Sequence, residues 1–354
     1  MGKKRRTIYL LALLTLLVTS CQKEPVILND VVYVRYKNAE MPAYIYGNFT
    51  NKIFIIYLHG GPGGNGLEYR TEIMTSRIEP QYAVVYFDQR NAGMSQGAFT
   101  MDDLTIDLMA EDVMALVKVI QHKYGSDCQF FLMGHSWGGA LGVATLLNKN
   151  NQDQFAGWIE VDGAHDLANA YVENIRFMKQ ICHEQLNLGN SVDFWSTVKD
   201  SLMLVDSINY NLSDNYYINS TATEAEQYLM DDGILSYYEF TLGGLMNELV
   251  AITFRNNPIT CKLNGRFGNA VLSVNGIWDR ISYTEEIADV KIPSLFMWGK
   301  YDMVVPPTLG QRAYELSGAS DKEFVLFESS GHSPMYQETS KFAVSIINFI
   351  ERNR

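Results

Sequence analysis

The sequence predicts an α/β fold: a mostly parallel, doubly wound sheet with a mainly helical cap domain inserted after the sixth strand. Three observations lead to this prediction. Uninterrupted apolar runs, at residues 53–58 and 83–87, are typical of strands buried on both faces of a parallel sheet. Segments with apolar residues at helical spacing alternate with such runs. Residues 165–289 break this alternation, because they contain helix-like segments and no clear buried strand.

The expected elements follow one another along the chain. Strands are expected at residues 31–36, 43–46, 53–58, 83–87, 128–133, 157–161, 294–298 and 323–327, with Met41-Pro42 separating the first two. Helices are expected at residues 102–124, 140–147 and 342–350 from the spacing of their apolar residues. The chain therefore divides into a leader at 1–20, a first core part at 21–164, a cap at 165–289 and a second core part at 290–354.

The leader has the features of an export signal. Four basic residues at positions 3–6 precede an apolar run at 8–18, which is too short to span a bilayer and suits a signal-peptide core. The small residues before Cys21 resemble the lipobox of bacterial lipoproteins, in which the cysteine is lipidated and the chain is cut before it. An ordinary cleaved signal is the alternative. We expect an exported chain that is lipid-anchored to the bacterial cell envelope through Cys21. An aspartate after the lipidated cysteine would be a signal for retention in the inner membrane, and Gln22 at this position therefore favours the outer membrane.

The charge of the chain argues against one class of partner. The formal net charge is −12, and removal of the leader with its four basic residues leaves 24 Lys and Arg against 40 Asp and Glu. So acidic a surface is a poor match for nucleic acid and for anionic lipid headgroups. We therefore expect no nucleic-acid partner, while the oligomeric state stays open.

Three cysteines remain besides Cys21, and none has the CxxC spacing that is typical of zinc sites. Cys128 opens an expected strand and is interpreted as a small core residue. Cys182 and Cys261 could pair in an oxidising envelope or remain free. We expect no metal site.

A tight turn joins the fifth expected strand to the helix after it. Its sequence is Gly134-x-Ser136-x-Gly138, and so sharp a turn needs residues without a Cβ on either side of the serine. The turn lifts the Ser136 hydroxyl above the carboxyl edge of the sheet, and the first helical amide, that of Trp137, points to the same space. Ser136 is therefore the candidate nucleophile, and the Trp137 amide is a candidate oxyanion donor.

A serine nucleophile needs a base, and the base needs a carboxylate that fixes its tautomer. His332 lies in the loop between the last expected strand and the last helix, and Asp302 lies in the loop after the strand before it. Both loops are at the carboxyl ends of strands, where α/β sheets place their chemistry. The chain order Ser136, Asp302, His332 is an order known from serine hydrolases. We expect these three residues to form a catalytic triad.

A glycine-rich loop, His59-Gly60-Gly61-Pro62-Gly63-Gly64, follows the third expected strand. Its glycines let backbone amides approach a substrate oxygen closely. The amide of Gly61 is the preferred second oxyanion donor, and that of Gly60 is the next choice. The loop after the fourth strand, Asp88-Gln89-Arg90, is interpreted as a structural brace of the site.

Together these motifs resemble those of the proline iminopeptidase-like branch of the α/β-hydrolase superfamily, the S33 type of serine peptidase. The motifs are His-Gly-Gly-Pro-Gly-Gly, Asp-Gln-Arg-x-x-Gly-x-Ser, Gly-x-Ser-Trp-Gly-Gly, Gly-x-x-Asp and Gly-His, and they cover the core but not the cap. The resemblance implies the α/β-hydrolase fold and a serine hydrolase without metal or organic cofactor. It implies Ser136 as nucleophile, His332 as base, Asp302 as its partner, and the amides of Gly61 and Trp137 as oxyanion hole.

The sequence departs from this family in two places. Asn91 follows the arginine where the family usually has glycine, although asparagine also tolerates a positive φ. These aminopeptidases bind the amino terminus of the substrate with acidic residues of the cap, and no Trp- and Glu-rich cap stretch of that kind is recognisable. Glu173, Glu239 and Glu248 are available for this role.

Two other functions fit the same features. A carboxylesterase or lipase-like hydrolase of small esters would use the same residues, and a non-catalytic lipoprotein could retain the shell to bind a ligand. An epoxide hydrolase or dehalogenase needs a carboxylate nucleophile, which Ser136 does not provide. We expect a small peptide, amide or ester as substrate, and cleavage of peptides or amides near the amino terminus is the preferred hypothesis.

Overall fold

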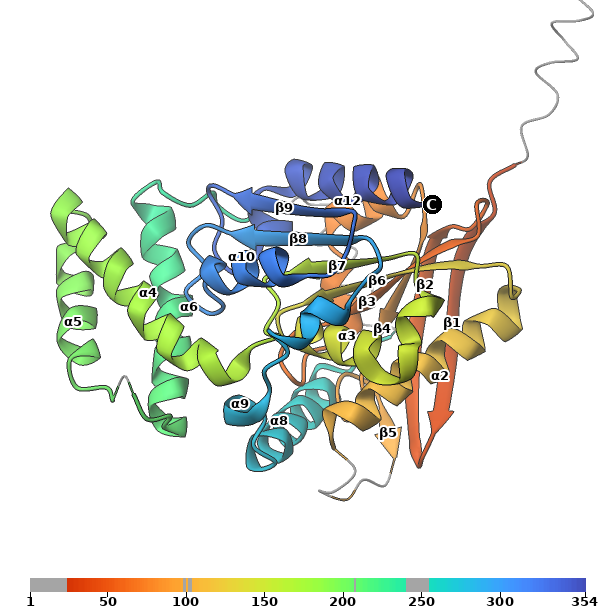
Figure 1. Ribbon diagram of the computed structural model, residues 1–354, viewed down its shortest axis with the longest axis horizontal. Coiled ribbons are helices and arrows are strands. Elements are labelled where there is room, and N and C mark those ends of the chain that lie inside the picture. Colours follow the sequence, from red (N-terminus) through yellow and green to blue (C-terminus); the bar gives the residue numbers. More distant parts are fainter. Residues whose placement is uncertain (1–23, 98–99, 101–103, 207, 240–254) are drawn as a thin grey trace, which may run out of the picture.

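The computed structural model describes residues 24–97, 100, 104–206, 208–239 and 255–354. Its centre is a nine-stranded mixed sheet in the order β1-β2-β4-β3-β6-β7-β8-β9, with β5 paired to β2 (Figure 1). The pairs β1/β2 and β2/β4 are antiparallel, whereas the pairs from β4 to β9 are parallel. The strands are β1 (Ile27–Tyr36), β2 (Ala39–Asn48), β3 (Ile53–Leu58), β4 (Ala83–Phe87), β5 (Gln96–Gly97), β6 (Gln129–His135), β7 (Gly157–Val161), β8 (Ser294–Gly299) and β9 (Lys322–Phe327).

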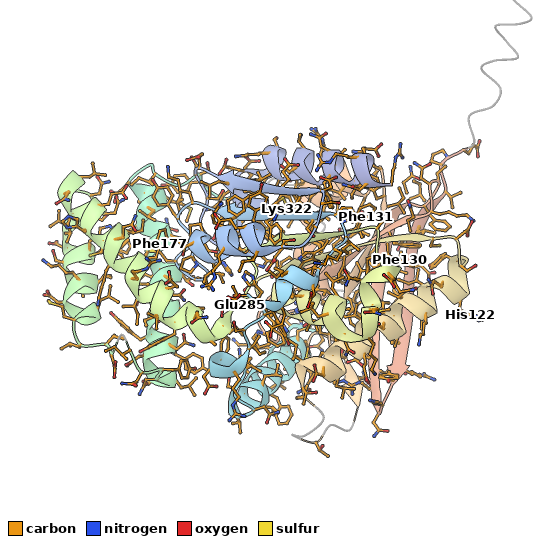
Figure 2. All side chains as sticks on the ribbon, in the orientation of Figure 1. His122, Phe130, Phe131, Phe177, Glu285 and Lys322 are labelled. Atoms are coloured by element: carbon orange, nitrogen blue, oxygen red, sulfur yellow. The ribbon has the colours of Figure 1, made fainter. Side chains whose placement is uncertain are left out.

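Helices cover both faces of the sheet, and each face has its own apolar core. One core contains side chains of α2 (Ile106–Tyr124), α3 (Trp137–Leu147) and α10 (Pro307–Leu316). The other contains side chains of η3 (Met74–Ile78) and α12 (Thr339–Asn353). Because successive side chains of a strand point to opposite faces, the neighbours Phe130 and Phe131 of β6 belong to different cores (Figure 2). The prediction of a doubly wound α/β sheet is confirmed.

The remaining short helices connect these elements. They are η2 (Gly66–Tyr69), η5 (Asn148–Gln154), η6 (Glu286–Asp289) and α11 (Pro334–Gln337).

Between β7 and β8 the chain leaves the sheet and forms a helical insertion. Its helices among the described residues are α4 (Leu167–Leu188), α5 (Val192–Leu202), α6 (Leu212–Asp231), α8 (Pro258–Val274) and α9 (Ile277–Arg280). Figure 1 shows α4, α5 and α6 beyond the carboxyl ends of β8 and β9. These three helices share a separate apolar core, which also includes Met303 from the loop after β8. The insertion follows the sixth strand of the sheet when the two-residue β5 is left out, and the domain boundaries drawn from the sequence stay a prediction.

The prediction that Met41-Pro42 separates the first two strands is wrong. Both residues lie inside β2, where Pro42 is opposite Tyr33 of β1. The Pro42 carbonyl accepts the amide of Asp88, so the backbone of Pro42 faces β4. The ladder between β2 and β4 ends at the pair of Ala43 and Phe87, so Pro42 lies one residue beyond it. A proline is tolerated there because no ladder hydrogen bond needs its N–H.

The helix expected from residue 102 begins at Ile106. Thr105 is its N-cap, and the Thr105 hydroxyl accepts the amide of Leu108 at 3.2 Å. Such a side-chain cap fixes the first residue of the helix. The spacing of apolar residues indicates that a helix is present but does not indicate where the cap lies.

The predicted signal peptide and the lipid attachment residue Cys21 lie outside the described residues. None of the helices in the described part of the chain has the length and apolar character that crossing a membrane requires. Cys128, Cys182 and Cys261 are free thiols. Cys182 is buried and donates to the carbonyl oxygen of Trp195 at 3.1 Å, so the possible pairing of Cys182 with Cys261 does not occur.

Candidate active site

Ser136 forms the junction between β6 and α3. β6 ends at His135 and α3 begins at Trp137, so one residue makes the turn. Ser136 has φ 53° and ψ −121°, a conformation that residues with a side chain rarely adopt. Its amide donates to Val161 at 3.0 Å and its carbonyl accepts from Ala164 at 2.8 Å, so contacts with the end of β7 and the loop after it hold the strained backbone in place.

The two glycines beside Ser136 are needed because backbones approach each other closely. A Cβ on Gly134 would lie 2.2 Å from the carbonyl oxygen of Gly138. A Cβ on Gly138 would lie 2.1 Å from the carbonyl oxygen of Leu58, at the end of β3. No side chain fits at either position, which confirms the sequence prediction that this turn needs residues without a Cβ.

His332 and Asp302 are brought together by the loops after β9 and β8. The His332 Nδ1 atom lies 2.8 Å from Oδ2 of Asp302. Asp302 is fully buried, and its Oδ1 accepts the amides of Val304 and Val305 at 2.8 Å each, which fixes the carboxylate. Because the carboxylate accepts, Nδ1 carries the proton and Nε2 is left to accept another one.

The surroundings of His332 favour its protonated form. Burial works against a charged imidazolium, but the charge of Asp302, its hydrogen bond and the charge of Glu226 outweigh burial and raise the pKa of His332. A raised pKa makes His332 a stronger base than an ordinary imidazole.

Ser136 and His332 lie in adjoining loops. The ring of His135, the residue before Ser136, has its centroid 4.8 Å from that of His332. The Nε2 atom of His135 donates to the carbonyl oxygen of His332 at 2.8 Å, which ties the two loops together. In the described part of the chain, no hydrogen bond joins the Ser136 hydroxyl to the His332 ring. Direct proton transfer needs these atoms within about 3.2 Å, and such contacts often tighten only when substrate binds.

The two other histidines of the site, His135 and His59, do not compete with His332 for the role of base. His135 uses both ring nitrogens, since Nδ1 also contacts the Tyr69 hydroxyl at 2.9 Å. Burial and the neighbouring charge of His332 lower the pKa of His135 to about 3. Burial lowers the pKa of His59 to about 4, and its Nδ1 lies 2.8 Å from the carbonyl oxygen of Gly60. Both imidazoles are therefore neutral structural groups near pH 7.

The glycine-rich loop after β3 passes beside the nucleophile. A Cβ on Gly60 would lie 3.2 Å from Cβ of Ser136. The Gly60 amide donates to the Tyr69 hydroxyl at 2.9 Å, so it is occupied. Among the described residues no hydrogen bond occupies the amide of Gly61, whose φ of 127° suits glycine. Of the two predicted loop donors, Gly61 is the one with a free amide, and Trp137 supplies the first amide of α3, which has no partner within its helix.

The Asp88-Gln89-Arg90 loop braces the site, as predicted. The Gln89 side chain donates to the carbonyl of His59 at 2.8 Å and accepts the Trp137 indole N–H at 3.0 Å. Arg90 forms a buried two-point contact with Asp112 at 2.6 and 2.8 Å. Asn91 has φ 56°, the positive value expected of a residue in place of glycine. The Trp137 ring is fully buried in this network and faces away from solvent.

The helical insertion contributes a carboxylate that the sequence analysis missed. Glu226 of α6 accepts the backbone amide of His332 at 2.8 Å, and its other oxygen accepts the Tyr238 hydroxyl at 3.3 Å. Burial and the charge of Asp302 raise the pKa of Glu226, although the hydrogen bond from His332 opposes the shift. No local signal distinguishes Glu226, because it is one acidic residue in the middle of a helix.

The acidic residues that the sequence offered for the cap lie elsewhere. Glu173 pairs with Arg176 and accepts from Thr308, and Glu239 accepts the Thr339 hydroxyl. Glu248 lies outside the described residues.

A second missed carboxyl group, Asp162, directly follows β7. It is fully buried, and its Oδ1 accepts the amide of Gly299 at 2.8 Å. Burial and the charge of Asp302 raise the pKa of Asp162 well above its usual range. The surroundings of Asp162 therefore favour its neutral form. Its position after a buried strand at the carboxyl edge of the sheet is a signal that could have identified it.

Asp162, Asp302 and His332 also form the type of cluster that can hold a metal ion, with ligand atoms within 4.8 Å of one another. Three of the four carboxylate oxygens already accept hydrogen bonds from the chain or from His332. The fourth oxygen, Oδ2 of Asp162, is buried and has no hydrogen-bond partner among the described residues.

Sequence comparisons find similarity to hydrolases of more than one kind. A family model described as serine aminopeptidase, S33, matches residues 54–216. A probable aminopeptidase of Bacillus subtilis is 23% identical over 86% of this chain and 91% of its own length. A proline iminopeptidase of Saccharolobus solfataricus is 24% identical over 84% of each chain. A 2-hydroxy-6-oxononadienedioate/2-hydroxy-6-oxononatrienedioate hydrolase of Escherichia coli is 21% identical over 84% of this chain and 87% of its own.

Solved structures agree with the fold. A proline iminopeptidase-related protein of Thermus thermophilus superposes with a TM-score of 0.61 at 18% identity, covering 92% of this chain and 98% of the other. A thermophilic esterase of Thermogutta terrifontis gives a TM-score of 0.56 at 17% identity, covering 91% and 98%.

Proposed function

From the similarity of this chain to proline iminopeptidases and other α/β-hydrolases, we propose that it is a serine hydrolase that cleaves small peptides or amides near their amino terminus. The observation that supports the proposal most is the contact of 2.8 Å between His332 Nδ1 and the buried Asp302, in loops tied to the strained turn that carries Ser136. An oriented imidazole beside a half-buried turn serine is the arrangement that acyl transfer needs.

The proposed mechanism is acyl transfer through a covalent intermediate. The Ser136 oxygen attacks the substrate carbonyl carbon while His332 Nε2 takes the hydroxyl proton, and Asp302 stabilises the imidazolium. The amides of Gly61 and Trp137 hold the negative oxygen of the tetrahedral intermediate. His332 then protonates the leaving amine, the acyl–Ser136 ester forms, and water repeats the sequence to release the acid. These steps use no metal or organic cofactor.

The proposal predicts a characteristic pH dependence. His332 acts as a base only when neutral, so kcat/KM should rise with pH, with a midpoint above the usual 6.5 of histidine because the pKa of His332 is raised. Part of the rise in the pKa of His332 comes from the charge of Glu226. A Glu226→Gln variant keeps an oxygen for the His332 amide but loses the charge, so the midpoint should move to lower pH.

A second carboxylate of the insertion provides the control for this measurement. Glu239 bonds to Thr339 and not to His332, so Glu239→Gln should leave the midpoint where it is. A midpoint that stays fixed or moves to higher pH in Glu226→Gln would contradict the electrostatic coupling between Glu226 and His332.

The contacts of Glu226 favour a second candidate function, hydrolysis of small esters. An aminopeptidase needs a carboxylate that is free to bind the substrate ammonium group. Both oxygens of Glu226 already accept hydrogen bonds, and Glu173 and Glu239 are bonded elsewhere. An esterase needs no such carboxylate and would use the same triad.

A substrate panel separates the two candidates. Aminoacyl arylamides, with the prolyl arylamide first, are compared with short acyl esters by their kcat/KM values. Hydrolysis of prolyl and other aminoacyl arylamides supports the peptidase. Turnover of esters alone would end the peptidase proposal in favour of the esterase.

We further propose that the chain is exported and anchored by a lipid on Cys21 to the outer membrane of a bacterial envelope. The basic and apolar leader and the small residues before Cys21 support this proposal. Fractionation of cells tests it, since Cys21→Ser should move the protein out of the membrane fraction. A wild-type protein found in the soluble fraction would refute it.

A further inference from the structure

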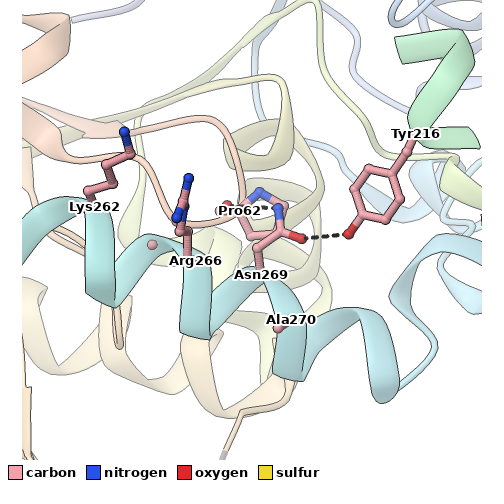
Figure 3. A pocket seen from close by; sticks show the side chains of 8 residues that line it. Pro62, Tyr216, Lys262, Arg266, Asn269 and Ala270 are labelled. Atoms are coloured by element: carbon pink, nitrogen blue, oxygen red, sulfur yellow. Dashed lines mark hydrogen bonds between the residues drawn. The ribbon is translucent and has the colours of Figure 1, made fainter. Parts of the chain in front are cut away.

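A pocket of about 460 Å³ lies between α6, α8 and the glycine-rich loop (Figure 3). Lys262, Arg266 and Asn269 of α8 line it together with Pro62 of the loop and Tyr216 of α6. The spacing of the three α8 residues places them along one side of that helix, as Figure 3 shows. The Tyr216 hydroxyl donates to Oδ1 of Asn269 at 3.4 Å, so α6 and α8 meet at one end of the pocket.

The pocket adjoins the proposed oxyanion hole. Helix α8 packs directly on the glycine-rich loop, because a Cβ on Gly265 would lie 2.1 Å from the carbonyl oxygen of Gly63. The Asn269 side chain donates to the carbonyl oxygen of Pro62 at 3.3 Å. Pro62 follows Gly61, the proposed oxyanion donor, in the chain. A group bound in the pocket would therefore lie beside the same loop that holds the reacting carbonyl.

The two cations of the pocket form an unfavourable pair without an anion. Lys262 and Arg266 are four residues apart on α8, and like charges at this spacing repel each other. Both side chains are exposed, and within the described ranges neither lies in ion-pair contact with a carboxylate. The chain has 40 acidic residues against 28 basic ones, so carboxylates to neutralise this pair are not scarce in the sequence. A bound anion would relieve the repulsion.

We propose that this pocket binds a carboxylate of the substrate, namely the free carboxyl terminus of a short peptide. The inference rests on the proposed function and names its substrate class. An arginine binds a carboxylate through two parallel hydrogen bonds, and a lysine adds a point charge. The two residue steps from Gly61, the proposed oxyanion donor, to Gly63, which lines the pocket, span at most about 7 Å, the length of two extended residues. Substrates are therefore di- and tripeptides whose carboxyl end lies in the pocket.

The test compares a dipeptide with its amide. The kcat/KM values for prolyl-alanine and prolyl-alaninamide are measured by release of the amine product. The wild-type enzyme should prefer the free acid by about 10- to 100-fold, the range of a hydrogen-bonded charge pair. Lys262→Met and Arg266→Met should each lower this ratio, and the double variant should bring it close to one. Both side chains are exposed, so these variants should fold.

A cation elsewhere on the insertion serves as the matched control. Lys179 of α4 is exposed and does not line the pocket, so Lys179→Met should keep the ratio of acid to amide. A ratio near one in the wild-type enzyme, or a ratio that both pocket variants retain, would overturn the proposal.

A binding measurement separates this proposal from the proposed function. If the wild-type enzyme hydrolyses neither peptides nor prolyl arylamide, the peptidase proposal fails. Calorimetric titration of the Ser136→Ala protein, which needs no turnover, then decides on the pocket. Tighter binding of prolyl-alanine than of its amide, lost in a Ser136→Ala, Arg266→Met double variant, supports the carboxylate site. Equal binding of the two ligands, or no binding of either, overturns it.

Discussion

Replacement of Ser136 by alanine is expected to lower kcat by about 10⁵- to 10⁶-fold, the loss that follows removal of the nucleophile in a serine triad. Without the hydroxyl, His332 has no proton to take, and no acyl-enzyme forms. Activity is measured with the best substrate of the arylamide and ester panel. A fluorophosphonate should label the wild-type protein and leave Ser136→Ala unlabelled, because the reagent bonds to the activated oxygen.

A nearby serine gives the control for this substitution. Ser333 follows His332, and its side chain makes no capping hydrogen bond to α11. Ser333→Ala removes a hydroxyl close to the base and should retain both activity and labelling. Full activity in a folded Ser136→Ala protein would exclude Ser136 as nucleophile. A well-folded wild-type protein that resists labelling would favour the non-catalytic lipoprotein over either hydrolase.

Replacement of Asp302 by asparagine is expected to lower kcat by about 10⁴-fold. The carboxylate accepts the proton of His332 Nδ1, whereas an amide group can donate to that nitrogen and so stabilise the wrong tautomer. The charge that stabilises the imidazolium is lost as well, so the acid limb of the pH profile should move to lower pH. Both effects are read from kcat and from kcat/KM as functions of pH.

Asp162 allows the same substitution to be made on the neighbouring carboxyl group. Burial and the charge of Asp302 favour the neutral form of Asp162, so Asp162→Asn replaces one neutral group by another next to Asp302. This variant should keep its activity within about tenfold of wild type. If Asp162→Asn lost as much activity as Asp302→Asn, the assignment of the triad carboxylate to Asp302 would be wrong, and the two groups would have to act as one unit.

Local patterns were sufficient for most of the sheet. The expected strands at 53–58 and 83–87 coincide with β3 and β4, because an uninterrupted apolar run buried on both faces has few other stable solutions. The first two strands were placed less well, since Met41-Pro42 has the local signature of a break. In the structure β2 pairs with β1 along its whole length, and Pro42 lacks only an N–H that no ladder hydrogen bond needs. The strand therefore continues through the proline.

The structure shows some of the contacts expected for the predicted site residues and leaves their catalytic roles untested. Asp302 and His332 are in contact, and the Gly61 amide is free beside the turn that carries Ser136. The triad itself stays a prediction until the substitutions above are measured. Glu226 could not be found from the sequence, because a single acidic residue in a helix has no pattern that indicates its contact.

The sequence by itself determined which loops carry chemistry in this protein. Parallel strands bring their carboxyl ends to one edge, so residues that follow buried strands must gather there, and the apolar runs that define those strands are local in the chain. Only the tertiary structure decided what the insertion adds, namely Glu226 on the His332 amide and α8 on the glycine-rich loop. These contacts join segments more than 100 residues apart through the shapes of two packed surfaces, and no periodicity in the sequence encodes such a fit.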